Sequence, residues 1–530
     1  MRRTYIFALM LLLAACGQHR NEDKMIFRYN ESAGITTLDP AFAKDQSLIW
    51  ACRQLYNGLV QLDTGLQVEP CIAKSWTISG DGREYRFTLR DDVWFHKDGL
   101  LGSDSTRRVV AEDFVYSLGR LTDPAVASPG AWIMREVEGM EALDDTTLVI
   151  RLKEPFAPFL SQLGMVYCSV VPKEVVEHWG KDFRSHPCGT GPFHFQYWKE
   201  GVKLVLRKNP LYFERDDEGT PLPYLDAVAV TFIIDKQTAF LEFMKGNLDF
   251  MNSLDASYKD EILNPDGTLK EKYTDRIDMV STPFLNTEYL GFNVEGVQGA
   301  QGMRELRQAV SCGFDRRKMM RYLRNNIGAP GTGGFIPKGL PGHSDCGYEY
   351  DAERARQLLS EVRKKNGGDL PKLKLSTTAN YLDLCKYIQQ QLGLLGLEIE
   401  VDVNPPAALS EQVAQGKTAW FRKSWVADYP DAENYLMLFY GPNRTPAGPN
   451  YTRFSNRRID KIYEKLRRET DAGRRMELMR EMDSLVMVEA PVIVLYYDQI
   501  LHFTHKGVTG LRSDAMNTLD LRRVRKGYGL

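Results

Sequence analysis

Alternating polar and apolar residues predict half-buried β-strands in the first third of the chain. Residues 84–90 read Glu-Tyr-Arg-Phe-Thr-Leu-Arg and follow a turn-like Ser-Gly-Asp-Gly. Side chains two positions apart share one face of a strand, so this run has one apolar and one polar face. Residues 147–152 form a second such run, reached through Asp144-Asp145.

Apolar residues at helical spacing alternate with such strands further along. Asp351 can cap a helix that runs to about Lys364. The next residues predict a strand at 373–378, a helix at 382–395 that Gly396 stops, and a strand at 397–403. This β-α-β order predicts a parallel sheet, and hence an α/β fold. A pair of helices is expected over residues 457–488, with a break near 471–473.

The N-terminus has the pattern of a targeting segment. Arg2 and Arg3 precede the apolar residues 5–13, and Leu13-Ala14-Ala15-Cys16 follows. This apolar run is shorter than the about 20 residues that span a bilayer. It resembles a bacterial lipoprotein signal, which predicts removal of residues 1–15, lipidation of Cys16 and a tether over 16–24. The alternative is an ordinary signal peptide with a chance cysteine.

Charge and size narrow the class of protein. Without Arg2 and Arg3 the mature chain has 66 basic residues against 70 acidic ones. This balance argues against nucleic acid as a partner. A hydrophobic fraction of 43% over 530 residues supports a full core and two or more domains.

No cofactor or metal site is expected. The chain has eight cysteines, and the seven after Cys16 show neither a CxxC motif nor clustering with histidine, so a zinc site is not indicated. Some of these cysteines could pair in an oxidising compartment, but the sequence does not assign pairs. His502 and His505 fall three apart in an expected strand and therefore on opposite faces.

Motifs for catalysis are also missing. Residues 189–193, Gly-Thr-Gly-Pro-Phe, lack the lysine of a phosphate loop and precede a strand pattern rather than a helix. The sequence has no HExxH and no GxSxG. A pair of carboxylates for glycoside hydrolysis stays open, because acidic residues are plentiful and none is singled out. We therefore expect a protein that is not an enzyme.

A series of short motifs resembles the family 5 extracellular solute-binding proteins, the oligopeptide- and dipeptide-binding group. The motifs occur in the expected order over nearly all of the mature chain. They are Leu38-Asp39-Pro40, Tyr56-Asn57-Gly58-Leu59-Val60, Val68-Glu69-Pro70, Ala73-Lys74-Ser75-Trp76, residues 81–90, Phe95-His96-Lys97-Asp98-Gly99, Glu112-Asp113-Phe114-Val115-Tyr116-Ser117-Leu118, residues 189–193, Asn209-Pro210-Leu211-Tyr212 and residues 425–431.

The resemblance implies a type II periplasmic-binding-protein fold, with two lobes, a hinge-spanned cleft and an extra α/β domain. The first lobe would be discontinuous, with the extra domain at 69–186 and the second lobe at 283–491. The pieces of the first lobe would be 25–68, 187–282 and 492–530. Such a protein would be a monomer that closes on a short peptide and delivers it to the permease subunits of an ABC transporter. It would lie in the cell envelope, in the periplasm or at the cell surface, anchored to the membrane through Cys16.

The resemblance also implies where the peptide would bind. Asp428, in Trp425-Val426-Ala427-Asp428-Tyr429, matches the aspartate that holds a peptide α-amine. A buried ammonium needs such a carboxylate partner. The alternative for Asp428 is a capping or turn role before Pro430, and a turn role is expected for the neighbouring Asp431.

Further residues match the lining of the family's cleft. Trp425, Tyr289 and Tyr497 match aromatic lining residues, and Arg422 matches an arginine that meets the ligand's carboxyl end. Residues 423–426, which include Ser424, are expected to receive an extended peptide as an added strand. Core packing is the alternative for the aromatic residues, and a surface role is the alternative for Arg422.

Departures from the family pattern keep other readings open. A disulfide of the oligopeptide-binding group would join positions that are Asn286 and Val426 here, so that bond is absent. The same fold could bind a non-peptide solute, such as a metal chelate, haem or a glycan fragment. An envelope hydrolase is the remaining alternative, although no nucleophile or metal motif supports it.

Overall fold

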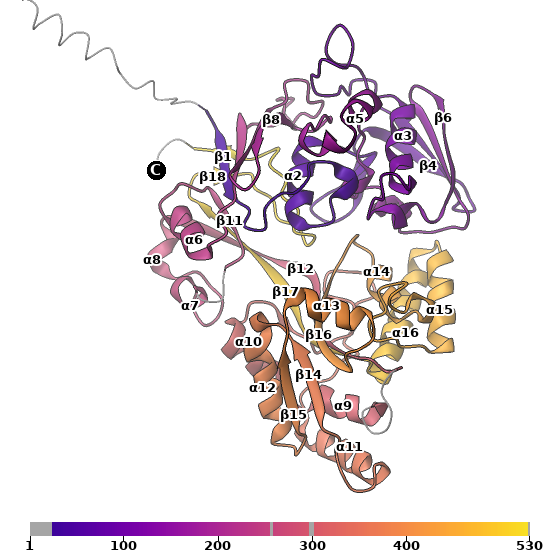
Figure 1. Cartoon of the computed structure of the whole chain (residues 1–530), viewed down its shortest axis with the longest axis vertical. Helices are drawn as coiled ribbons and strands as arrows, with labels where there is room; N and C mark the ends of the chain where they lie inside the picture. The colour runs from indigo at the N-terminus through magenta and orange to yellow at the C-terminus, as the bar shows by residue number, and fades with distance from the viewer. Residues whose placement is uncertain (1–23, 255–257, 296–301, 528–530) are drawn as a thin grey trace, which may run out of the picture.

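The computed structural model describes residues 24–254, 258–295 and 302–527 of the 530-residue chain. Two lobes lie one above the other in Figure 1, and two long strands connect them. These are β12 (Ile277–Phe292) and β17 (Val492–His505). The expected signal segment, Cys16 and most of the tether lie outside the described residues.

One mixed sheet runs through both lobes. Its strands lie in the spatial order β15 (Ile399–Val403), β14 (Leu373–Thr377), β16 (Trp420–Val426), β12, β17, β11 (Phe250–Asn252), β1 (Ile26–Asn30), β10 (Ala227–Thr231), β9 (Lys203–Lys208) and β8 (Phe193–Lys199), and β13 (Ala329–Pro330) also pairs with β17. Strands β14 and β15 are parallel and flank α12 (Leu382–Gly393) in sequence, which confirms the β-α-β unit expected there.

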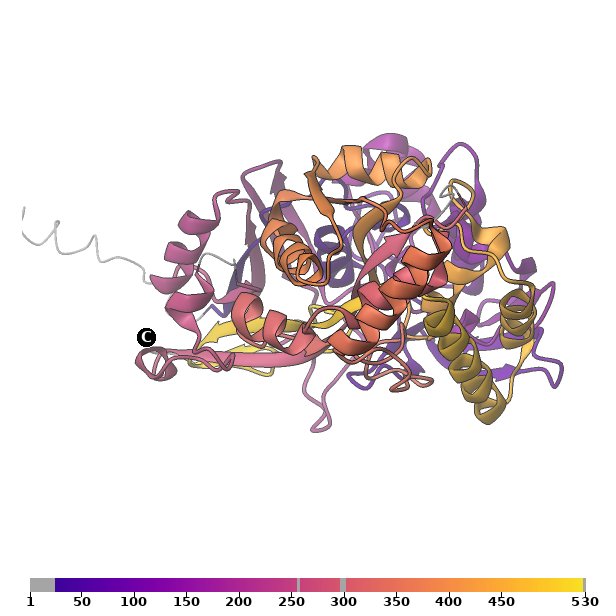
Figure 2. The same ribbon diagram turned by 90° about the horizontal axis from the view of Figure 1, so that it is seen from below.

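The connection between the lobes is an antiparallel pair with a slip in its register. Residues 277–283 of β12 pair with 499–505 of β17, and residues 287–291 pair with 492–497. A β-bulge of this kind bends a strand pair and increases its local twist. Figure 1 shows the two strands passing from one lobe to the other, and Figure 2 shows them side by side. The slip between Pro283 and Thr287 therefore marks the point where the chain crosses.

The first lobe has a large apolar core, which extends from Phe27 to Val524, and a smaller one around Phe243 of α6 and Phe503 of β17. It includes an antiparallel sheet apart from the main one. The sheet has the order β4 (Ala73–Ile78), β5 (Glu84–Leu89), β7 (Thr147–Leu152) and β6 (Val137–Asp144), and the helices of this lobe include α2 (Gln46–Leu55), α3 (Ala111–Thr122), α5 (Lys173–Trp179) and α6 (Lys236–Met244). The expected division into domains stays a prediction. Residues 492–497 of β17 pack in the apolar clusters of the second lobe, whereas the expected division had assigned them to the first.

The glycine-rich residues 189–193 are a packing motif in this lobe. A Cβ atom on Gly189 would come within 2.2 Å of the Leu55 carbonyl oxygen, and one on Gly191 within 2.4 Å of the Leu55 carbonyl carbon. The Gly191 N–H donates to the Leu55 carbonyl, 2.9 Å away. Asn209 donates to the Gly191 carbonyl at 2.9 Å. Close approach of two backbone segments explains the glycines without a phosphate ligand.

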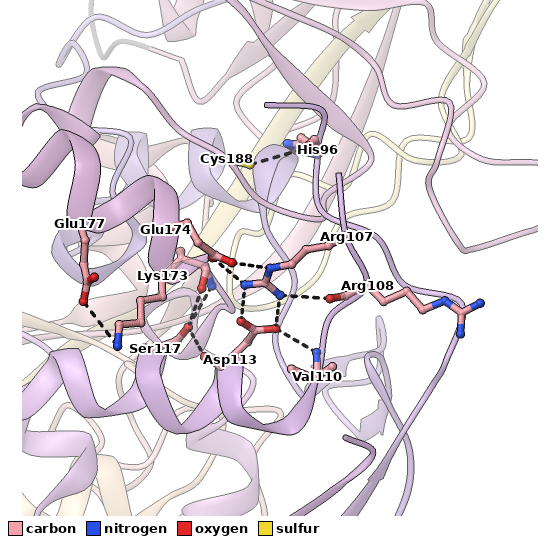
Figure 3. Close-up of polar contacts among 11 residues, drawn as sticks. His96, Arg107, Arg108, Val110, Asp113, Ser117, Lys173, Glu174, Glu177 and Cys188 are labelled. Atoms are coloured by element: carbon pink, nitrogen blue, oxygen red, sulfur yellow. Dashed lines mark hydrogen bonds and ion pairs between the residues drawn. The ribbon is translucent and has the colours of Figure 1, made fainter. Parts of the chain in front are cut away.

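A buried ion pair fixes the start of α3 (Figure 3). Asp113 accepts from the Val110 N–H at 2.9 Å, and Arg107 donates to both of its carboxylate oxygens at 2.8 Å. Arg107 also holds Glu174 of α5 with two bonds of 2.8 Å. The guanidinium thus ties two helices together and satisfies a carboxylate whose side chain is 6% exposed.

The second lobe covers both faces of its part of the main sheet. Two apolar clusters meet there, one on each face. Its helices are α9 (Arg304–Cys312), α10 (Arg316–Arg324), α11 (Ala352–Lys365), α12, α13 (Pro406–Ala414), α14 (Glu433–Leu436), α15 (Arg457–Arg468) and α16 (Ala472–Glu489). Asp351 caps α11 through the Arg354 N–H, as expected from the sequence. The helical pair is broken at residues 469–471, because Asp471 caps α16 and Ala472 already belongs to it.

The seven cysteines in the described part of the chain are free thiols. Among the described residues, no cluster of histidine, cysteine and acidic side chains could hold a metal ion. The described helices are too short or too polar to cross a membrane.

Candidate functional site

Strand β16 places the expected site residues on two opposite faces. It pairs antiparallel with β12 and puts Val426 opposite Asn286. Because side chains alternate along a strand, Lys423 and Trp425 project from one face, and Arg422 and Ser424 from the other. Asp428 follows the strand.

Asp428 is held by one neighbour and keeps solvent access. The Asn434 amide donates to its carboxylate at 3.2 Å, and the Asn434 carbonyl oxygen accepts from the Asp428 N–H at 3.1 Å. The same oxygen accepts from the Trp425 indole at 3.0 Å. No cation of the described residues pairs with Asp428. Surrounding protein raises the pKa of its carboxyl, and the Asn434 bond lowers it part of the way back.

The second acidic residue of this loop is already paired. Asp431 accepts two bonds from Arg475, of 2.9 and 2.7 Å, and also accepts from the Glu433 N–H at 2.8 Å. A carboxylate whose two oxygens both accept from a guanidinium nitrogen has little capacity left for a ligand. The geometry therefore leaves Asp428 as the available carboxylate.

Asp428 faces the first lobe. Burial raises the pKa of Tyr167, and the charge of Asp428 raises it further, which places the carboxylate within electrostatic reach of this first-lobe phenol. The ring of the next residue, Tyr429, lies 6.1 Å from the ring of Trp132, also in the first lobe. The carboxylate thus lies between the lobes.

Lys423 and Trp425 share the face that leads to Asp428. The Lys423 ammonium lies 4.0 Å from the ring centroid of Tyr451. Burial, and secondarily the charge of Arg422, lowers the pKa of Lys423 to about 8. The charge of Asp428 raises the pKa of the same Tyr451, after burial.

Arg422 lies on the opposite face within a balanced group of charges. It forms an ion pair with the buried Glu288, and its guanidinium stacks 3.1 Å from the centroid of the Tyr381 ring. Arg324 pairs with Asp498 at 2.9 Å on the same face. Two cations thus meet two anions, so a ligand carboxylate would have to compete with Glu288 for Arg422.

A cavity of about 520 Å³ separates the lobes on the Arg422 side. Its first-lobe wall comes from β1, α6 and β11, and its second-lobe wall includes Arg324 and Tyr381. Tyr381 therefore separates Arg422 from the cavity.

The edge of β16 at Ser424 and Val426 has no strand partner within the described parts of the chain, so it can accept another strand. Strand β14 pairs with β16 only at Trp420 and Phe421. The bond from the Ala427 N–H to the Leu285 carbonyl directs the odd-numbered residues of β16 towards β12. Backbone groups of Ser424 and Val426 therefore point away from β12, past the end of β14.

Tyr289 and Tyr497 lie in the interior. They are 1% and 3% exposed. Tyr289 packs at 5.2 Å against the ring of Phe335, and the Tyr497 hydroxyl donates to the Gly334 carbonyl at 2.6 Å. Core packing accounts for both in this structure, and their role as lining residues stays a prediction.

The sequence analysis missed one residue of the site and the charge of another. Lys423 was expected only for its backbone, within 423–426, although strand alternation places its side chain on the same face as Trp425. Asn434 had no such signal, because its position in the first turn of α14, six residues after Asp428, depends on how the loop folds.

Comparisons with known proteins place the chain among transport proteins. The family model "Bacterial extracellular solute-binding proteins, family 5 Middle" matches residues 67–447. The glutathione-binding protein GsiB of Escherichia coli (strain K12) is 25% identical over 484 residues, which cover 90% of each protein.

Solved structures share the fold. The periplasmic binding protein DppA from Helicobacter pylori, in complex with peptide STSA, superposes with a TM-score of 0.76 at 23% identity and covers 94% of this chain and 98% of its own. The Escherichia coli murein tripeptide binding protein MppA gives a TM-score of 0.73 at 23% identity, over 95% and 99%. The expected periplasmic-binding-protein fold is confirmed.

Proposed function

The chain belongs to the bacterial extracellular solute-binding proteins of family 5, and from this premise we propose that it captures short peptides between its lobes. The observation that carries the proposal is Asp428, a carboxylate between the lobes with no cation of the described residues beside it. A free peptide brings an ammonium group that needs a carboxylate once its water is removed.

The free edge of β16 supports a peptide as the ligand. Backbone groups of Ser424 and Val426 can pair with an extended chain, which binds peptides largely without reading their side chains. GsiB is named for glutathione, DppA was solved in complex with peptide STSA, and MppA is named as a murein tripeptide binding protein. All three ligands contain peptide units, which agrees with this mode of binding.

The remaining roles follow from the same proposal. Trp425 would contact the ligand beside Asp428. Arg422 would add positive charge on the opposite face of β16, behind the Tyr381 ring. Tyr289 and Tyr497 would support the cleft from behind. The protein would bind its ligand without cleaving it, as a monomer, and deliver it to an ABC permease. Lipidation of Cys16 would anchor it in the cell envelope, facing the periplasm or the cell surface.

Calorimetry with tri-alanine and N-acetyl-tri-alanine tests the role of Asp428. We expect the acetylated peptide to bind about a hundredfold more weakly, because the loss of one partner of a desolvated pair costs roughly 3 kcal/mol. Asp428→Asn should weaken free tri-alanine equally and abolish the difference. Asp369→Asn changes an exposed aspartate of the same lobe and should leave both affinities unchanged.

Equal affinity of the wild type for the two peptides would contradict amine capture. Native mass spectrometry of the purified protein provides an independent check. A co-purified compound whose mass fits a metal chelate, haem or glycan would show that the ligand is such a solute and not a peptide.

A further inference from the structure

Lys423 is a half-buried cation without an anionic partner. Among the described residues, its ammonium forms no ion pair and no hydrogen bond, and its contact is the face of the Tyr451 ring at 4.0 Å. An ammonium group withdrawn from water without such partners is unfavourable. Its position therefore requires an explanation beyond packing.

Other buried cations of the second lobe are satisfied. Arg475 pairs with Asp431, and Arg422 pairs with Glu288. Arg316 has no carboxylate partner but donates to the backbone carbonyls of Val494 and Ser311. Lys423 differs from all three, because its charge is left for a group outside the described chain.

Lys423 and Asp428 form a complementary pair of vacant charges. Lys423 projects from the same face of β16 as Trp425, which shares the Asn434 oxygen with Asp428. Both charges neighbour Tyr451, yet no ion pair joins them. They are five positions apart in the chain, so their Cα atoms are at most about 17 Å apart. An extended tripeptide, about 10 Å long, fits within that limit.

We propose that Lys423 binds the carboxylate end of the ligand whose amine end Asp428 binds, so that the protein selects short peptides with a free carboxyl terminus. The inference rests on the proposed function, because it assigns the second end of the same ligand. A lysine ammonium is a compact charge, so it can bind a carboxylate while it lies over an aromatic ring. It does not need the planar two-bond geometry that arginine uses.

The geometry favours Lys423 over Arg422 for this role. Arg422 is neutralised by Glu288, and Tyr381 covers it on the side of the cavity. A carboxylate at Arg422 would meet the like charge of Glu288. A carboxylate at Lys423 would meet a positive charge that lacks a partner. It would take the place of the water that the ammonium loses when the lobes close.

A competition experiment with tripeptides tests the assignment. An equimolar mixture of tri-alanine and tri-alanine amide is presented to the wild type, Lys423→Met, Lys423→Arg and Lys417→Met, and the bound fractions are read by native mass spectrometry. Lys417 is exposed and lies three residues before β16, so its substitution matches the change in charge away from the site.

We expect the wild type and Lys417→Met to retain the free acid about tenfold over the amide, since a hydrogen bond to a charged group contributes at this scale. Lys423→Met should lose the preference and keep its affinity for the amide, and Lys423→Arg should restore part of it. A preference that survives Lys423→Met, or none in the wild type, overturns the assignment.

The two proposals fail differently. If acetylation weakens binding but Lys423→Met keeps the preference for free acid, amine capture stands and the role of Lys423 is wrong. If neither tripeptide is retained by any variant, both proposals are overturned.

Discussion

At the residue scale, the charge of Asp428 depends on one neighbour. Asn434 is fully buried and fixes both the carboxylate and the Trp425 ring beside it. Its amide is a donor that cannot lose a proton, so it favours the ionised carboxylate without neutralising it. An arginine in its place would compete with the ligand ammonium.

This arrangement predicts how binding responds to acid. The pKa of Asp428 is raised, so the carboxylate loses its charge at a higher pH than an ordinary aspartate does. Affinity for tri-alanine should therefore fall as the pH falls through this raised pKa. Asn434→Ala removes the bond that lowers the pKa, and should move the acid limb to higher pH. Calorimetry across a pH series measures both midpoints.

Two observations would contradict this assignment. One is an acid limb that persists in Asp428→Asn, because that variant has no carboxyl at position 428 to titrate. The other is a midpoint that moves to lower pH in Asn434→Ala. If Asn434→Ala fails to fold, the pH dependence of binding by Asp428→Asn still shows whether Asp428 is the titrating group.

Residue roles were harder to predict from sequence than elements were. Asp428 was found through the motif around it, and its freedom could be recognised only once Asp431 was seen to pair with Arg475. The pairing of Arg422 with Glu288 needs the register between two strands far apart in sequence. No local pattern carries that register. Trp425 shares the Asn434 side chain with Asp428, and its role as a lining residue stays a prediction.

At the element scale, strongly periodic segments were predicted well. The strands at 84–89 and 147–152 and the capped helix α11 follow from alternation and from Asp351. The strand expected around His502 and His505 is β17, which has 14 residues because both of its ends pair with β12. Such length is set by tertiary pairing rather than by propensity.

The ion pair at the start of α3 provides a test of stability. Arg107→Met should lower the free energy of unfolding by about 3 kcal/mol, because it leaves the buried Asp113 carboxylate without its cation. Lys173→Met is the matched control, since Lys173 and Glu177 are each 58% exposed and lie 3.7 Å apart (Figure 3). That exposed pair should contribute less than about 1 kcal/mol.

Urea denaturation followed by tryptophan fluorescence measures both variants against the wild type. Equal shifts of the two midpoints would show that the cluster around Arg107 is no more important than a surface contact.

At the scale of the whole molecule, the lobes touch on the side of Asp428 as well as at the hinge. Arg467 of α15 pairs at 2.7 Å with Glu136, the residue before β6, and lies 5.0 Å from the Phe156 ring. Arg468 pairs with Glu154 at 2.8 Å. These contacts lie between the lobes, so they stabilise their present approach.

Closure should therefore depend measurably on Arg467. Arg467→Met should weaken tri-alanine binding by up to about fivefold, because a partly exposed ion pair contributes about 0.2–1 kcal/mol. Arg457→Met, in the exposed first turn of the same helix, should have no effect. Small-angle scattering should show a larger radius of gyration for Arg467→Met than for the control. Identical scattering and affinity would exclude a role in closure.

The unpaired edge of β16 also bears on how this protein avoids aggregation. A bare strand edge is a template for pairing with other chains, and proteins normally block it with charge, proline or a bulge. Here the edge at Ser424 and Val426 ends beside Asp428, which faces the opposite lobe. A strand of another folded protein would bring the neighbouring strands of its own sheet with it. It could therefore not enter the space between the lobes. The site that receives a loose peptide is in this way closed to intermolecular sheet growth.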